Sequence, residues 1–70
     1  MTWIDTPESS NITGFGYDGD AQVLTVEFKK GGRYQYYDVP QMVFDQMKAA
    51  PSKGQFLAQN IKGTYRYARS

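Results

Sequence analysis

The chain has 70 residues and a net charge of +1, and it contains neither cysteine nor histidine. A chain of this length forms one small domain, whose core supplies only about 3 to 5 kcal/mol of net stability. Without thiolate or imidazole the usual zinc sites are excluded, and without cysteine there is no disulfide framework. We therefore expect no metal site, and the lack of cysteine favours a cytoplasmic protein.

Neither a membrane span nor an export signal is predicted. No run approaches the roughly 20 apolar residues that cross a bilayer, and residues 1–5 lack the basic and apolar regions of a signal peptide. We expect a soluble protein with no membrane partner.

Charge is distributed unevenly along the chain. Residues 1–28 carry −5, residues 29–45 carry +1, and residues 46–70 carry +5 with no acidic side chain. An acid-free C-terminal third indicates an anionic partner, unless the two ends of the chain pair in the fold and cancel.

The N-terminal part begins with a segment of low regularity. We expect residues 1–8 to form a flexible arm, because Trp3 and Ile4 are its only large apolar groups. Residues 11–17 predict a first strand with Phe15 and Tyr17 on one face. The two glycines in it indicate a bulge or a close approach to another backbone. Asp18-Gly19-Asp20 then predicts a turn rather than a metal loop.

Residues 24–39 predict a β-hairpin that reverses at Gly31-Gly32. A three-residue loop, residues 30–32, pairs Phe28 with Tyr34 and places Tyr34 and Tyr36 in the core. A two-residue loop instead places both tyrosines on the polar face, because a slip of one residue turns every side chain over. We favour the three-residue loop, because the two-residue loop leaves Phe28 opposite Arg33 or Gln35 and places two large aromatic side chains on the polar face.

After Val39 the apolar spacing becomes helical. Pro40 suits the first helical position, and Val43, Met47 and Ala50 form an apolar stripe that ends before Pro51. Ser52 and Gln55 form a capping box for a second helix, which Gly63 is placed to terminate.

These elements predict an α+β fold. Three antiparallel strands would carry two short helices packed on one face, and residues 64–69 would form either a short last strand or an ordered arm. The domain is expected to cover residues 9–70.

The pattern resembles the KTSC domain, a family named for a C-terminal extension of some lysyl-tRNA synthetases and also found as small bacterial and phage proteins. The match runs from Gly16-Tyr17-Asp18 to Tyr65, with Tyr34-x-Tyr36 as its most recognisable feature and Ser52-Lys53-Gly54-x-Phe56 downstream. The resemblance implies no catalytic residue and no cofactor, and RNA binding is suggested for the family. Ala58 departs from the pattern, because relatives often carry a polar residue such as asparagine there.

The first candidate site is the predicted helix start at Ser52, Lys53 and Gly54. Free N–H groups and the helix dipole attract anions there, and Lys53 adds a full charge. The alternative is simple helix capping, with Lys53 in solvent and Gly54 making a close packing contact.

The second candidate site interleaves aromatic with basic residues, a composition typical of single-strand nucleic-acid binding. In the hairpin it comprises Lys29, Lys30, Arg33, Tyr34, Tyr36 and Tyr37. In the tail, Lys62, Arg66 and Arg69 are candidate phosphate ligands, and Tyr65 and Tyr67 are candidate stacking platforms. Tyr34, Tyr36, Phe56 and Ile61 are instead interpreted as structural members of the family motif.

The sequence therefore predicts a non-enzymatic binding module. Its expected ligand is RNA, tRNA or a nucleotide-like anion bound through the basic C-terminal surface. The alternative is a module that binds another protein or forms a homo-oligomer through a sheet edge or exposed aromatic residues.

Overall fold

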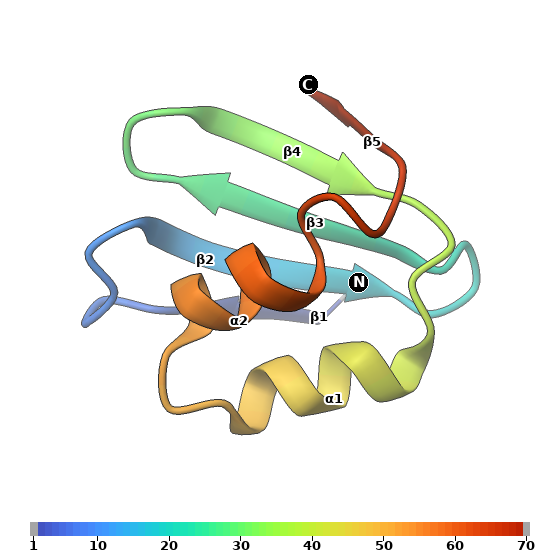
Figure 1. Cartoon of the computed structure of the whole chain (residues 1–70), viewed down its shortest axis with the longest axis horizontal. Helices are drawn as coiled ribbons and strands as arrows, with labels where there is room; N and C mark the ends of the chain where they lie inside the picture. The colour runs from blue at the N-terminus through green and yellow to red at the C-terminus, as the bar shows by residue number, and fades with distance from the viewer. Residues whose placement is uncertain (1, 70) are drawn as a thin grey trace.

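The computed structural model describes residues 2–69 and shows a five-stranded antiparallel sheet with two helices on one face (Figure 1). The strands lie side by side in chain order, each hydrogen-bonded to the next. The elements are β1 Thr2–Asp5, β2 Ile12–Asp18, β3 Val23–Phe28, β4 Gly32–Tyr36, α1 Gln41–Ala49, α2 Lys53–Asn60 and β5 Tyr67–Arg69.

The α+β prediction is confirmed, but the prediction of three strands is wrong. The strand that was missed is β1, which lies within the segment expected to be an arm and pairs Ile4 with Phe15. Of the two forms expected for residues 64–69, the short strand is present as β5, which pairs Tyr36 with Tyr67. The division into an arm of residues 1–8 and a domain of residues 9–70 stays a prediction, and its end residues Met1 and Ser70 lie outside the described residues.

The position of β1 depends on the first glycine of β2. The register of β2 against β3 shifts between Ile12 and Gly14, which is the expected bulge. A methyl group on Gly14 would lie 2.9 Å from the carbonyl oxygen of Ile4 and 2.9 Å from the indole ring of Trp3. The glycine therefore provides the close backbone approach that was also expected of this strand.

The hairpin of β3 and β4 has the predicted side-chain faces in a different register. Its three-residue loop is Lys29–Gly31 instead of residues 30–32, so Phe28 pairs with Gly32, and Val26 pairs with Tyr34. The pairing moves by two residues because Gly32, at φ +80°, supplies the left-handed conformation that closes the turn. A shift of two preserves the faces, and Tyr34 and Tyr36 point toward the helices.

The core lies between the sheet and the helices. Phe44 of α1 stacks on Tyr17 with ring centroids 5.0 Å apart and meets Phe15 edge to face. The Tyr17 hydroxyl donates a hydrogen bond to the carbonyl oxygen of Val39. The other buried apolar side chains are Ile12, Leu24, Val26, Tyr36, Val39, Met47, Leu57 and Ile61.

Both helices begin and end close to the predicted residues. Pro40 is the N-cap of α1 and precedes the first helical residue, and α1 ends at Ala49, before Pro51. The Ser52 hydroxyl caps α2 by accepting a hydrogen bond from the backbone N–H of Gln55 at 3.3 Å. Neither helix has the length and apolar character needed to cross a bilayer.

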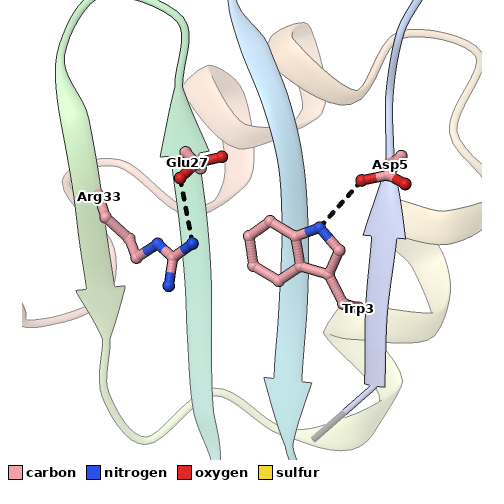
Figure 2. A network of polar contacts seen from close by, with 4 residues as sticks. All are labelled: Trp3, Asp5, Glu27 and Arg33. Carbon is pink, nitrogen blue, oxygen red and sulfur yellow. Dashed lines mark hydrogen bonds and ion pairs between the residues drawn. The ribbon is translucent and has the colours of Figure 1, made fainter.

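The outer face of the sheet, opposite the helices, carries a polar network around the indole of Trp3 (Figure 2). The indole N–H donates to Asp5 at 3.1 Å, and the Arg33 guanidinium lies 5.2 Å from the ring centroid. Arg33 also forms an ion pair with Glu27 at 3.1 Å. These contacts tie β1 and β4 together across the two strands between them.

We expect Gly14→Ala to lower the free energy of unfolding by about 1 to 3 kcal/mol, because the new methyl group forces β1 away from β2. Urea denaturation monitored by Trp3 fluorescence measures the change. Gly19→Ala is the matched control, since its methyl group would lie 3.5 Å from the side-chain oxygen of Gln41, an ordinary contact. Equal stability of the two variants would contradict the close-approach role of Gly14.

Tyr17→Phe should lower the unfolding free energy by about 1 to 3 kcal/mol, because the carbonyl of Val39 loses its buried donor. Burial, with Asp18 and Asp45 nearby, raises the pKa of Tyr17 above its ordinary value of 10.0. The unfolded chain therefore releases this proton first, so stability is fully present below pH 10.0 and falls as the pH rises above it. Urea denaturation from about pH 9 to about pH 11 should show a shallower fall in Tyr17→Phe than in the wild type. Parallel pH profiles would contradict the prediction.

Candidate functional site

A groove of about 860 Å³ lies between α2 and the part of the sheet formed by β3, β4 and β5. Its volume is within the range of small-ligand sites. The strands and the hairpin loop supply one wall, and α2 with the turn after it supplies the other. The groove is lined by Asn11, Ile12, Phe28, Lys30, Gly31, Tyr34, Tyr36, Gly54, Leu57, Ala58, Lys62, Gly63 and Tyr67.

Four aromatic rings run along the sheet side of this groove. Phe28 meets Tyr34 edge to face at 5.3 Å, and Tyr67 lies 5.7 Å from both Tyr34 and Tyr36. The pairing of β3, β4 and β5 places these residues on the face of the sheet that carries the helices. Tyr67 is 58% exposed, so a large aromatic surface is open to a ligand.

The charges around the groove are positive. Lys30 and Lys62 line it, and the ammonium of Lys62 lies 5.3 Å from the ring centroid of Phe28. The guanidinium of Arg69 lies 6.0 Å from the ring centroid of Tyr34, and no acidic residue is among the lining residues. The groove therefore combines flat apolar surface with a cationic rim.

These three cations have no carboxylate partner, and among the described residues Lys29 and Lys53 also have none. The ion pairs of residues 2–69 are Arg33 with Glu27, Lys48 with Asp45, and Arg66 with Asp38. None of them includes Lys30, Lys62 or Arg69. Three of the five cations that lack a carboxylate partner in residues 2–69 thus lie beside the aromatic row.

Tyr36 lies deepest among the aromatic residues of the groove, with 2% of its surface exposed. Burial, together with the neighbouring Tyr34 and Tyr67, raises the pKa of Tyr36 above its ordinary value of 10.0. Its hydroxyl therefore keeps its proton at neutral pH.

The predicted tail residues are divided between the groove and other positions. Lys62 and Tyr67 line the groove, and Arg69 lies over its aromatic row. Arg66 instead forms its 3.4 Å ion pair with Asp38 and lies over the ring of Tyr37. Tyr65 is half-buried and packs against the core.

The predicted helix start at Ser52, Lys53 and Gly54 lies at a smaller pocket of about 190 Å³. The Lys53 ammonium donates to the carbonyl oxygen of Ala50 at 2.7 Å, just after the C-terminal end of α1. A methyl group on Gly54 would lie 3.4 Å from the side-chain nitrogen of Asn11. The contacts of this segment are those of capping and packing, and only Gly54 also reaches the groove.

The residues interpreted as structural occupy two environments. Ile61 is fully buried and Phe56 is half-buried against the core. Tyr34 and Tyr36 contribute both to the packing and to the groove wall.

Sequence reasoning placed Lys30 in the hairpin set of the second candidate site but did not include Phe28, which also lines the groove. The available signal was the interleaving of bases and aromatic residues in the hairpin, which already contained Lys30. Ala58, where the sequence departs from the family pattern, also lines the groove.

The sequence is similar to known proteins over most of its length. It is 43% identical over 61 residues to a lysine–tRNA ligase of Trichormus variabilis, covering 87% of this chain but only 11% of that enzyme. The chain thus spans about a tenth of the length of that relative. A small protein of Tsukamurella paurometabola is 44% identical over 59 residues, which cover 84% of this chain and 88% of that protein.

The fold is similar to that of a solved structure. A crystal structure of a KTSC domain protein from Yersinia pestis superposes with a TM-score of 0.90 at 34% sequence identity and covers 99% of both chains. The family model of the KTSC domain matches residues 8–65. The resemblance seen in the sequence is thereby confirmed: the chain belongs to the KTSC domain family.

Proposed function

We propose that this domain is a non-catalytic module that binds single-stranded RNA in the groove between α2 and the sheet. The observation that carries the proposal is the coincidence of unpaired cations with an aromatic row. Lys30, Lys62 and Arg69 have no carboxylate partner within residues 2–69, and they lie along Phe28, Tyr34 and Tyr67.

This combination matches what a single strand needs from a protein. Unpaired bases expose faces that stack on aromatic rings, and the phosphates between them bind basic side chains. A duplex hides its base faces, so it would use only the cations. The groove should therefore favour single strands over duplexes of equal charge.

The relatives support RNA as the nucleic acid. A lysine–tRNA ligase acts, by its name, on tRNA, and a segment of such an enzyme is 43% identical to this chain. That segment is only 11% of the enzyme, so the amino-acid ligation activity of the whole enzyme does not carry over to this chain. The relative supports only the choice of RNA as the nucleic acid.

We expect the wild type to bind a fluorescein-labelled single-stranded RNA at low salt, measured by fluorescence anisotropy. Each neutralised phosphate of a single strand should contribute about −0.7 to the slope of log affinity against log salt. Lys62→Gln should weaken binding and make the slope less negative by about 0.7.

Lys48→Gln is the matched control, because it removes the same charge from α1, where Lys48 is paired with Asp45 at 3.3 Å. It should leave the affinity close to that of the wild type. Absence of RNA binding at low salt would contradict the proposal. Equal losses in the two variants would show that net charge alone, and not the groove, holds the RNA.

The alternative function, self-association or protein binding, has one specific observation in its favour. β5 is an edge strand whose three residues are all exposed, so its free backbone groups could pair with a second strand. Light scattering over a concentration series tests it, and we expect a monomer throughout. A dimer that dissociates on substitution of Ala68 by proline would favour the alternative.

A further inference from the structure

The hydroxyl group of Tyr36 has no hydrogen-bond partner among residues 2–69, although only 2% of this residue is exposed. The contrast with Tyr17 is direct. Tyr17 is buried to a similar degree, and its hydroxyl donates to the carbonyl of Val39. Buried hydroxyl groups in proteins are normally paired, so the state of Tyr36 needs an explanation.

The explanation lies in where the hydroxyl points. No side-chain oxygen or nitrogen of the described residues is both fully enclosed and without a partner. The unpaired Tyr36 hydroxyl therefore reaches open space, and the groove is the space that Tyr36 lines. The floor of the groove thus presents a polar group to whatever enters it.

Resting on the RNA-binding function proposed above, we infer that the groove holds one unstacked nucleobase, whose edge hydrogen-bonds to the Tyr36 hydroxyl. The walls and the rim fit this ligand. A base that enters edge first meets the exposed ring of Tyr67 with its face. Its phosphate stays outside, beside Lys62 and Arg69. A bare phosphate would use the rim alone and leave the floor hydroxyl unpaired.

The hydroxyl is suited to a base edge because it both donates and accepts one hydrogen bond. The hydroxyl is protonated at neutral pH, as that of any tyrosine with a pKa of 10.0 or above is. Every base has a donor or an acceptor on its edge, so this contact selects a base over an abasic backbone without choosing one base.

The experiment compares Tyr36→Phe with Tyr17→Phe, two variants that each remove one hydroxyl from a buried ring. The probes are a single-stranded RNA of about 12 nucleotides and an abasic oligomer of the same length and charge. Affinity is measured by anisotropy and stability by urea denaturation.

For Tyr36→Phe we expect the affinity for RNA to fall about two- to tenfold. The affinity for the abasic oligomer and the salt slope should not change, and the free energy of unfolding should be unchanged or higher. For Tyr17→Phe we expect the reverse, lower stability and unchanged RNA affinity. If RNA binds with the expected dependence on Lys62 and Tyr36→Phe binds it equally well, the base contact is wrong and the RNA-binding function stands. If Tyr36→Phe is clearly less stable, the hydroxyl is structural and the inference falls. If the wild type does not bind RNA, both proposals fail.

Discussion

The pairing of β3 with β4 is the constraint on which both the core and the groove depend. A sheet with helices on one side buries only that face, and strand residues alternate between faces. The register that sets Tyr36 opposite Leu24 directs both side chains toward the helices. A slip of one residue would put Tyr34 and Tyr36 on the same face as Thr25 and Glu27, so the tyrosines would turn away from the helices while Leu24 and Val26 stayed in the core. Stability and ligand binding are therefore tied to the same register.

α2 divides the inner face of the sheet between these two tasks. Leu57 and Ile61, four residues apart, are buried in the core. Ala58 and Lys62, each one position further along the chain, line the groove. α2 and the turn after it thus face the core with Leu57 and Ile61 and the groove with Ala58 and Lys62, and Leu57 also lines the groove. The small side chain of Ala58 leaves room there, and the short length of α2, eight residues, leaves the rings beyond it uncovered.

The sequence could predict the elements whose signals are local. The hairpin faces, the Ser52 cap and the Pro51 stop all follow from adjacent residues, and the structure has each of them. β1 could not be predicted in this way, because Thr2–Asp5 is only four residues long, although three of the four favour strands. Its docking depends on the missing side chain of Gly14, in another strand, and on the Trp3 contact with Arg33 from β4. The two-residue error in register came from placing Gly32 inside the loop, whereas Gly32, at φ +80°, follows the loop and pairs with Phe28.

The candidate site was harder to predict because charge along a sequence does not show which charges are neutralised in the fold. The acid-free C-terminal third suggested that Lys53, Lys62, Arg66 and Arg69 would act together. In the fold, Arg66 crosses to Asp38, and Lys53 turns to the carbonyl of Ala50. Within residues 2–69 no ion pair joins the acidic residues before position 29 to the basic residues after position 45, and the middle segment neutralises only part of the basic charge of the tail. The remainder includes Lys62 and Arg69 from the tail, and β4 brings Lys30 of the hairpin loop to the same groove. The site is therefore defined by the cations that both lack a carboxylate partner and lie beside the aromatic row, and not by the total charge of the tail.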